Sequence, residues 1–460
     1  MYLSSLASAL MLLGAADALP RSSNAGYHGS RSPYRRTIQS RDQASVLAEL
    51  LGTKPTRASP TSADDLRSRL SSIWGGNTNS TTVDFYSGIK TQINANIGVP
   101  DIITDVVDVL VGPYRPIGYT NNINPRSPSS PIYPSAMNST DPDFTLSEAK
   151  LRAAIQIPSS FTYGQRPPVI LVPGTGGYGG ENFDSNILKV LSGATFGDAV
   201  WLNVPGALLD EAQRNAEYVA YAVNYISGIS GHKNVSLISW SQGGLDIQWA
   251  FTFWPSIRFK VSDFVAVSPD FHGTTLAKAL CLSAGAGTTD VDPCPASVIQ
   301  QEYNSKFVSA LRAAGGGDAY VPTTTLYSAS YDEIVEPQQG VIASAFIGDA
   351  RGVGVTNVEA QSTCFGTVAA GFYGHAEMLF HPLTIALVTD ALSHEGPGSL
   401  ARLDLNEVCS TYVAPGLTVE NAVDTAAQIV TAAIRLLAYQ PRLTEEPELM
   451  PYAMAASEKS

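Results

Sequence analysis

The sequence has few charged residues, and most of those are acidic. Of its 460 residues, 28 are Lys or Arg and 41 are Asp or Glu, which gives a formal net charge of −13. A protein that binds nucleic acid needs a basic face, so this balance argues against a nucleic-acid partner. Charged residues make up 15% and apolar residues 44%, which excludes a disordered chain and predicts a globular protein with a large core. The length is enough for one large domain with an added segment, or for two domains.

Long hydrophobic runs are almost absent. An apolar run over residues 3–16 is followed by the small-x-small pattern of residues 16–18, although no basic residues precede it. This predicts a signal peptide over residues 1–18, and therefore a secreted, extracellular protein. The run is too short to span a bilayer and no other run reaches 18 apolar residues, so we expect no integral membrane association.

Cysteine is scarce as well. Four cysteines in a secreted chain predict two disulfides, and three pairings are open. Three Asn-x-Ser/Thr sequons predict glycosylation at Asn79, Asn138 and Asn234, the last of which directly precedes an apolar strand. We expect neither a metal nor a cofactor.

The first 149 residues differ in composition from the rest. Residues 19–41 are polar and contain the dibasic pair Arg35-Arg36, which fits a propeptide and, equally well, a plain flexible lead-in. Residues 42–112 carry helical patterns and predict a small helical pre-domain. Residues 113–149 are rich in Pro, Ser and Asn and are interpreted as a linker to a main domain over residues 150–460.

An α/β pattern begins near residue 150. The apolar patterns predict strands at 168–172, 200–204, 235–240, 261–267, 323–328 and 358–361, and helices at 211–229, 245–251 and 300–314. Strands that alternate with helices in this way predict a mainly parallel sheet with helices on both faces.

Residues 235–251 are typical of a strand, a tight turn and a helix, with Ser241 at the turn. A nucleophile elbow has this form, because the sharp turn exposes the hydroxyl and directs backbone N–H groups to the same space. Gly243 fills the second glycine position of G-x-S-x-G, whereas the small residue Ser239 replaces the first. The alternative is an ordinary strand–helix connection that contains a serine.

A serine nucleophile needs a base, and the base needs an acid that orients it. In this kind of fold the three follow in the order Ser, Asp, His. His375 lies in a glycine-flanked loop before a helix, whereas His381 and His394 are expected to face solvent or cap that helix. Asp332 follows the strand at 323–328, one strand before the His375 loop, and is the preferred acid. Asp270 also follows a strand, where a pocket role and a loop or cap role are both open.

The glycine-rich loop of residues 173–180 follows the first strand of the main domain. Its spacing matches neither G-x-G-x-x-G nor a phosphate-binding loop with its lysine. In a hydrolase with an elbow, this loop supplies the second oxyanion donor, and we prefer that interpretation to a phosphate cradle.

Several strings resemble the fungal lipase family of Candida antarctica lipase B, in matching order over residues 150–455. They are Leu171-Val172-Pro173-Gly174-Thr175-Gly176, Phe183-Asp184-Ser185-Asn186, Trp240-Ser241-Gln242-Gly243-Gly244, Phe253-Trp254-Pro255-Ser256-Ile257-Arg258, Pro322-Thr323-Thr324, Leu326-Tyr327-Ser328-Ala329, Asp332-Glu333-Ile334-Val335 and Glu448-Leu449-Met450-Pro451-Tyr452-Ala453. The resemblance implies an α/β-hydrolase fold with an N-terminal helical extension of its own, because residues 42–145 have no clear counterpart. Ser330-Tyr331 stand before Asp332 where the family has one residue.

The resemblance also implies roles for individual residues. Ser241 would be the nucleophile, Asp332 the acid and His375 the base, with Thr175 and Gln242 forming the oxyanion hole. The implied pocket residues are Trp240 on the alcohol side, Asp270 and Gln301 on the acyl side, and Ile334. The resemblance further implies a disulfide between Cys364 and Cys409, which leaves Cys281 to pair with Cys294.

Together these features predict a secreted serine hydrolase that cleaves carboxylic esters, in particular triacylglycerols, through an acyl-enzyme. Its expected partners are a lipid or other ester substrate and a lipid–water interface. The alternatives are a carboxylesterase or acyltransferase of the same fold that acts on smaller or non-lipid esters, and a catalytically silent interaction protein.

Overall fold

The computed structural model describes residues 126–135, 140–277, 280, 293–329 and 331–457. The expected signal peptide, the lead-in of residues 19–41 and the helical pre-domain of residues 42–112 lie outside the described residues. So do the sequons at Asn79 and Asn138.

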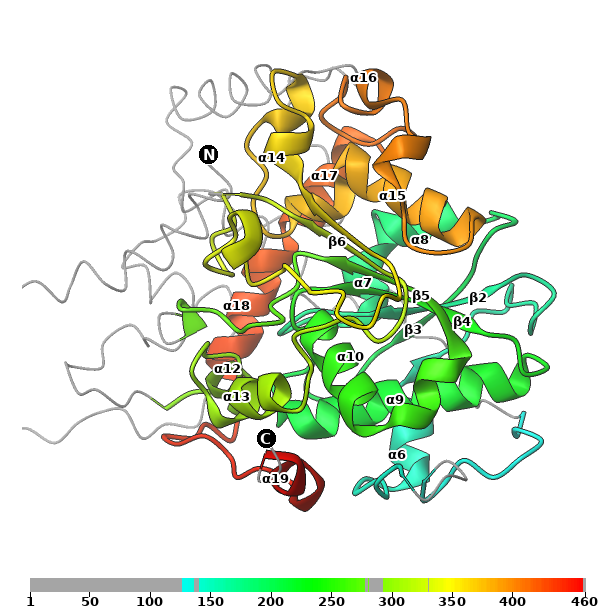
Figure 1. Ribbon diagram of the computed structural model, residues 1–460, viewed down its shortest axis with the longest axis vertical. Coiled ribbons are helices and arrows are strands. Elements are labelled where there is room, and N and C mark those ends of the chain that lie inside the picture. Colours follow the sequence, from blue (N-terminus) through cyan, green and yellow to red (C-terminus); the bar gives the residue numbers. More distant parts are fainter. Residues whose placement is uncertain (1–125, 136–139, 278–279, 281–292, 330, 458–460) are drawn as a thin grey trace, which may run out of the picture.

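A seven-stranded sheet forms the centre of the described part (Figure 1), with the strand order β1-β3-β2-β4-β5-β6-β7. All neighbouring strands are parallel except β1, which runs antiparallel to β3. The strands are β1 Ile155–Gln156, β2 Pro168–Val172, β3 Asp198–Leu202, β4 Val235–Trp240, β5 Val261–Val267, β6 Thr323–Tyr327 and β7 Val355–Glu359. The predicted, mainly parallel sheet is confirmed.

Helices lie on both faces of this sheet, with α9 and α10 on one side and α8 and α15 on the other (Figure 1). The α-helices are α6 Glu148–Ala153, α7 Gly179–Asp184, α8 Ile187–Leu191, α9 Ala212–Ile229, α10 Gln242–Phe253, α12 Ala296–Gln300, α13 Lys306–Ala313, α14 Ala360–Thr363, α15 Pro382–Ser393, α16 Leu405–Val408, α17 Val419–Ala426, α18 Gln428–Ala438 and α19 Pro451–Ser457. Short 3-10 helices are η1 Pro255–Lys260, η2 Gly340–Ile342, η3 Val368–Ala370, η4 Glu377–Phe380 and η5 Leu400–Arg402.

The alternation of side chains along β2 explains why both faces need cover. Ile170 and Val172 belong to the core cluster that contains α9 and α10, whereas Val169 and Leu171 belong to the cluster on the opposite face. All four are fully buried. Successive residues of a strand point to opposite faces, so a continuous apolar run is stable only between two helical layers.

Three of the predicted elements are shifted or divided in the structure. The strand expected at 200–204 occupies Asp198–Leu202, because buried Asp198 is neutralised by Arg166 at 2.7 Å and so can begin a core strand. The helix expected at 300–314 is divided into α12 and α13, since Ser305 caps a new helix by accepting a hydrogen bond from the Val308 N–H. The strand expected at 358–361 is β7, Val355–Glu359, and the chain becomes helical at Ala360.

The described residues of the expected linker pack closely on α9. The Glu217 carboxylate of α9 accepts hydrogen bonds from the N–H groups of Thr145 and Leu146, at 2.8 and 3.0 Å. Phe144 is buried and stacks on Trp254 with ring centroids 5.9 Å apart. Residues 140–149 therefore contribute to the core of the main domain.

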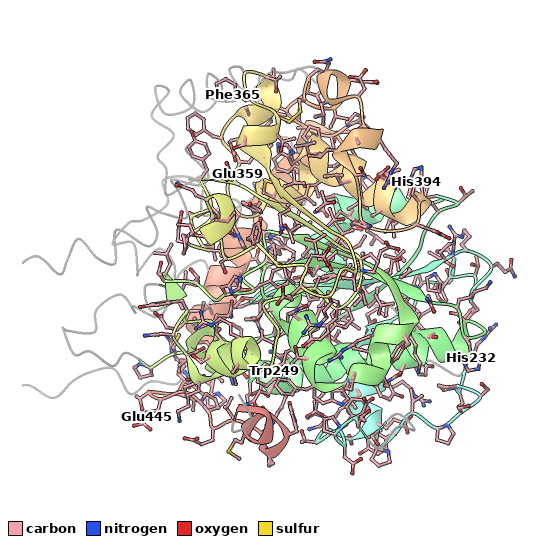
Figure 2. The ribbon with its side chains drawn as sticks, viewed as in Figure 1. His232, Trp249, Glu359, Phe365, His394 and Glu445 are labelled. Atoms are coloured by element: carbon pink, nitrogen blue, oxygen red, sulfur yellow. A yellow bond between two sulfur atoms is a disulfide. The ribbon has the colours of Figure 1, made fainter. Side chains whose placement is uncertain are left out.

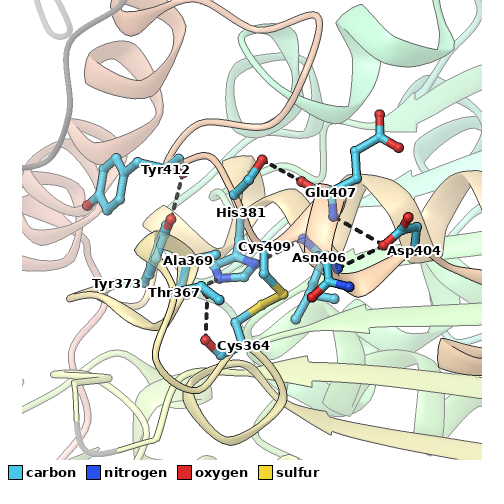
Figure 3. Close-up of a disulfide and its surroundings, with 12 residues drawn as sticks. Cys364, Thr367, Ala369, Tyr373, His381, Asp404, Asn406, Glu407, Cys409 and Tyr412 are labelled. Carbon is cyan, nitrogen blue, oxygen red and sulfur yellow. Dashed lines mark hydrogen bonds between the residues drawn. A yellow bond between two sulfur atoms is a disulfide. The ribbon is translucent and has the colours of Figure 1, made fainter.

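One disulfide joins Cys364, at the end of α14, to Cys409, at the end of α16 (Figure 3). The sulfur atoms are 2.01 Å apart and both cysteines are buried. The Ala369 N–H donates to the Cys409 carbonyl at 3.2 Å. The disulfide thus fixes the start of the loop that leads to His375.

Candidate active site

Ser241 occupies the turn between β4 and α10 in a strained backbone conformation. Its φ of 55° and ψ of −132° lie outside the regions that residues with a Cβ favour. The turn is so tight that a Cβ on Gly243 would lie 2.4 Å from the Pro173 carbonyl oxygen. A Cβ on Gly174 would lie 2.9 Å from the Ser241 Cβ, so glycine there gives the serine room. This backbone has the geometry of a nucleophile elbow.

The structure brings His375 and Asp332 together, although they come from loops after different strands. His375 Nδ1 lies 2.8 and 3.0 Å from the two Asp332 carboxylate oxygens. His375 Nε2 is buried and has no hydrogen-bond partner within the described part of the chain. A histidine whose Nδ1–H is held by a carboxylate has the other nitrogen available to accept a proton.

Backbone contacts fix both side chains in place. The Asp332 Oδ1 accepts hydrogen bonds from the N–H groups of Ile334 and Val335, at 3.1 and 2.8 Å. The His375 carbonyl accepts a hydrogen bond from Trp240 Nε1 at 3.1 Å. Trp240 is the residue before Ser241, so this bond ties the histidine loop directly to the end of β4.

Asp270, the other candidate acid, is fully buried but not paired with His375. Neither of its carboxylate oxygens has a hydrogen-bond partner among the described residues. Burial raises the pKa of Asp270 to about 7, against a smaller opposing effect of the nearby His375. The geometry therefore assigns the carboxylate–histidine contact to Asp332.

Two further carboxyl groups contact the backbone beside His375, and the sequence reasoning missed them. Glu333 accepts a hydrogen bond from the His375 N–H at 2.9 Å, and Glu377 accepts one from the Gly374 N–H. A Cβ on Gly374 would lie 2.7 Å from an oxygen of Glu333 and 2.6 Å from one of Glu377. Burial raises the pKa of both carboxyl groups. The only signal in the sequence was the acidic neighbour of Asp332 and a second acid two residues after His375.

The glycine-rich loop lies against the start of α10. The Gln242 Oε1 accepts hydrogen bonds from the Thr175 hydroxyl at 2.8 Å and from Gln301 Nε2 at 2.9 Å. Gln242 Nε2 donates to the Leu208 carbonyl at 3.0 Å. Gln242 is the first residue of α10, and the first N–H groups of a helix have no partner within the helix. The structure thus places Thr175 beside a helix N-terminus that begins directly after Ser241.

Comparisons with known proteins agree with this geometry. No family model matches the chain. The chain is 34% identical to Lipase B of Pseudozyma antarctica over 331 residues, which cover 71% of this chain and 90% of that protein. The crystal structure of Aspergillus fumigatus lipase B matches with a TM-score of 0.72 and 37% identity, over 98% of this chain and 99% of the other.

The chain belongs to the lipase B family. It is therefore a carboxylic ester hydrolase with the α/β-hydrolase fold, and its substrates are esters. The predicted family and fold are confirmed.

In this lipase B family member, the four expected pocket residues are partly or fully buried. Trp240 is buried, with its ring centroid 5.3 Å from that of His375. Ile334 is half-buried and directly follows Glu333, which contacts the His375 backbone. Gln301 is buried, and its Nε2 donates to the Ser297 carbonyl at 3.1 Å as well as to Gln242 Oε1. Asp270 is the fourth, and the roles of all four in substrate binding stay predictions.

A buried acid on α10, Asp246, was not anticipated from the sequence. It is fully buried one turn after Gln242, and its Oδ2 accepts a long hydrogen bond from Gln242 Nε2 at 3.4 Å. Burial, with a smaller contribution from Asp270, raises its pKa well above the ordinary value. Asp246 lies in a mainly apolar stretch of α10, and the apolar periodicity of a helix does not predict which of its polar residues are buried.

The remaining sequence predictions have different outcomes. Cys294 is buried, but its expected partner Cys281 lies outside the described residues, so that pairing stays a prediction. Asn234 is exposed at the start of β4, in a position that leaves it accessible to glycosylation. No helix of the described ranges is long and apolar enough to cross a bilayer. Nor do the described residues gather three His, Cys, Asp or Glu side chains in an arrangement that would hold a metal.

Three other histidines of this domain make their hydrogen bonds away from the elbow. His232 and His394 are exposed and lie toward one side of the molecule (Figure 2). His381 is fully buried and caps α15, where its Nδ1 accepts a hydrogen bond from the Leu383 N–H at 3.1 Å. Of the two alternatives expected for His381, the structure shows the helix cap and not exposure to solvent.

Proposed function

We propose that this chain is a secreted triacylglycerol lipase that uses Ser241 as the nucleophile, His375 as the base and Asp332 as the orienting acid. The observation that carries the proposal is the contact of His375 Nδ1 with Asp332, which leaves Nε2 free in a loop tied to Trp240, the neighbour of the strained Ser241. The Cys364–Cys409 disulfide supports secretion, because disulfides persist in oxidising compartments.

The first half of the reaction forms an acyl-enzyme. Ser241 Oγ attacks the ester carbonyl carbon while its proton passes to His375 Nε2, and Asp332 stabilises the imidazolium that results. The carbonyl oxygen becomes an oxyanion, which the N–H groups of Thr175 and Gln242 and the Thr175 hydroxyl stabilise. The intermediate then collapses, and the departing alkoxide takes the proton from His375 Nε2 and leaves as the alcohol.

The second half releases the acid. Water attacks the acyl carbon and gives its proton to His375 Nε2, which returns that proton to Ser241 Oγ as the carboxylic acid departs. The Thr175 hydroxyl donates to Gln242 Oε1 in the free protein, so stabilising the oxyanion requires it to turn away from that acceptor. No cofactor or metal takes part in these steps.

The test is a covalent fluorophosphonate label together with ester hydrolysis. The wild type should be labelled at Ser241, and Ser241→Ala should lose labelling and about 10⁶-fold in kcat while it keeps the fold. Hydrolysis of emulsified long-chain triglycerides faster than that of monomeric short-chain esters would support a lipase. The reverse preference would indicate a carboxylesterase, and transfer to added alcohols in preference to water would indicate an acyltransferase. A folded wild type that neither labels nor hydrolyses any ester would contradict the proposal.

A further inference from the structure

An arginine on α18 contacts three residues of the loop that carries Thr175. We call residues 173–181 the oxyanion loop. Arg435 Nη1 donates to the Gly176 carbonyl at 3.0 Å, and the guanidinium carbon lies 4.8 Å from the centroid of the Tyr178 ring. The two terminal nitrogens of Arg435 donate to the Glu181 carboxylate at 2.6 and 2.9 Å. One side chain from a helix more than 250 residues away thus binds the loop at its middle and at its end.

This ion pair differs from an ordinary surface salt bridge. Both carboxylate oxygens of Glu181 are engaged, and the two side chains are only 19% and 10% exposed. Bidentate arginine–carboxylate pairs fix an orientation as well as a distance. Reduced contact with water also weakens the screening that makes most surface pairs worth little.

A second connection reaches the other side of Thr175. Asn182 Oδ1 accepts a hydrogen bond from the Gly174 N–H at 3.1 Å, and Asn182 Nδ2 donates to Gln428 Oε1 of α18 at 3.2 Å. Both side chains are buried. Gly174 and Gly176, the two neighbours of Thr175, are therefore both bonded to α18, one directly and one through Asn182.

The loop needs such support, because its own sequence does not fix its shape. It contains glycine at 174, 176, 177, 179 and 180, and glycine loses more conformational entropy on ordering than any other residue. Gly176 has a φ of 71°, and a Cβ there would lie 2.8 Å from the Ala432 Cα of α18. The helix backbone thus packs directly against the loop, at the one residue whose conformation requires glycine.

From these contacts we infer that Arg435 is a positioning residue for the oxyanion hole. It sets the place of Thr175 by holding Gly176 and Glu181 against α18, and it does not touch the substrate. The inference rests on the proposed function, because it needs Thr175 to stabilise an oxyanion. Oxyanion donors act only when they are fixed in advance at the position that the charge will occupy. Loss of the contact should therefore lower kcat and leave substrate binding nearly unchanged.

The test compares Arg435→Met with a matched control, Arg402→Met. Arg402 likewise bonds both oxygens of a carboxylate, that of Asp390, and one backbone carbonyl, that of Pro397. Its partners belong to α15 and the segment after it, not to the oxyanion loop. Both variants remove a contact with both oxygens of a carboxylate and one bond to a backbone carbonyl, so both should lose thermal stability.

Turnover should separate the two variants. With a monomeric short-chain ester, kcat per Ser241 titrated with fluorophosphonate should fall about 10-fold or more in Arg435→Met, a part of the ~10²–10³-fold that one oxyanion donor supplies. KM should stay within about twofold, and Arg402→Met should match the wild type. Arg435→Lys, which keeps the charge but not the bidentate geometry, should fall between them and serves if the Met variant does not fold.

Glu181→Gln tests the route of the coupling. It should lower kcat in the same direction, and the double variant with Arg435→Met should be no slower than Arg435→Met alone, because one contact is removed twice. Unchanged kcat in Arg435→Met and Arg435→Lys, a change confined to KM, or an equal loss in Arg402→Met would overturn the inference. A wild type without ester turnover would instead overturn the proposed function, and the positioning role with it.

Discussion

Asp270 shows at the scale of one residue how burial can dominate the protonation state of a carboxyl group. In the unfolded chain its carboxyl ionises near its ordinary pKa of 3.8, whereas in the fold burial raises this pKa to about 7. At pH values between 3.8 and about 7, the folded protein binds one proton more at Asp270 than the unfolded chain does. The free energy of unfolding therefore falls as pH rises through this window. Above pH 7 the buried carboxylate is ionised and destabilises the fold by the full amount.

Asp270→Asn should remove that destabilisation. The variant should be more stable than the wild type at pH 8, by an amount on the order of 4 kcal/mol at most, and the difference should vanish toward pH 4. Thermal or urea unfolding across this pH range measures it. Asp390→Asn is the control and should be destabilised at pH 8, because Asp390 pairs with Arg402 at 2.6 Å. A variant at Asp270 that is less stable than the wild type at pH 8 would show that the ionised carboxylate is accommodated.

The buried His381 should give the opposite pH dependence. Burial lowers its pKa to about 4, and its Nδ1 accepts a hydrogen bond from the Leu383 N–H. Its Nε2 donates to the Ala369 carbonyl at 2.9 Å, and both residues are drawn in Figure 3. The unfolded chain binds a proton near pH 6.5 and the folded one only near pH 4. Stability should therefore decrease as pH falls from 6.5 to 4, by about 3 kcal/mol.

His381→Asn should flatten this decrease. Asparagine keeps an acceptor for the helix cap but does not titrate, so the variant should be less stable overall and less dependent on pH. His232→Asn is the matched control, since His232 is exposed and its φ of 61° suits asparagine. Free energies of unfolding at several pH values decide the matter. A slope in the His381 variant equal to that of the wild type would assign the acid sensitivity to other groups.

At the scale of elements, the catalytic prediction concerns the oxyanion loop, which follows β2 and includes the first turn of α7. Thr175→Val keeps the backbone and the shape but removes the hydroxyl, so kcat should fall by roughly 10²–10³-fold with a much smaller change in KM. Thr175→Ser keeps the hydroxyl and should stay close to the wild type. Steady-state rates on a monomeric ester test both variants. A loss confined to KM would place the Thr175 hydroxyl in contacts with the bound substrate instead.

For the whole molecule, the contacts of residues 126–149 predict where the main domain begins. A chain that starts at Arg126 keeps the hydrogen bond of Tyr225 to the Arg126 carbonyl, at 2.6 Å, and the packing of Phe144. A chain that starts at Leu146 loses these contacts and leaves buried Glu217 without the Thr145 bonds. Both should hydrolyse esters, because the proposed catalytic residues all follow residue 170.

The shorter chain should unfold at a lower temperature, with a loss of about 3 kcal/mol or more from two lost hydrogen bonds to the buried Glu217 carboxylate and one lost aromatic anchor. Melting temperatures of the two chains, with activity per titrated serine, measure this. Equal melting temperatures would show that residues 126–145 add nothing to the core. Activity only in a chain that includes residues 42–112 would mean that the expected pre-domain completes the site.

By itself the sequence determined the features that depend on neighbouring residues. The buried strands, the order of the α/β elements and the elbow at Ser241 follow from local apolar patterns and from two small residues beside the serine. The choice of His375 and Asp332 came from their loop positions and from the Ser, Asp, His order along the chain, and the family strings added the α/β-hydrolase fold.

Only the tertiary structure decided the contacts between distant segments. It shows that Glu333 and Glu377 meet at Gly374, that Asp246 lies under Gln242, and that Arg435 reaches the oxyanion loop. These pairs follow from how helices and loops pack on the sheet. A charged residue in an exposed helix and one that contacts a loop of the candidate active site look alike in sequence, because the partner of the charge comes from another part of the fold.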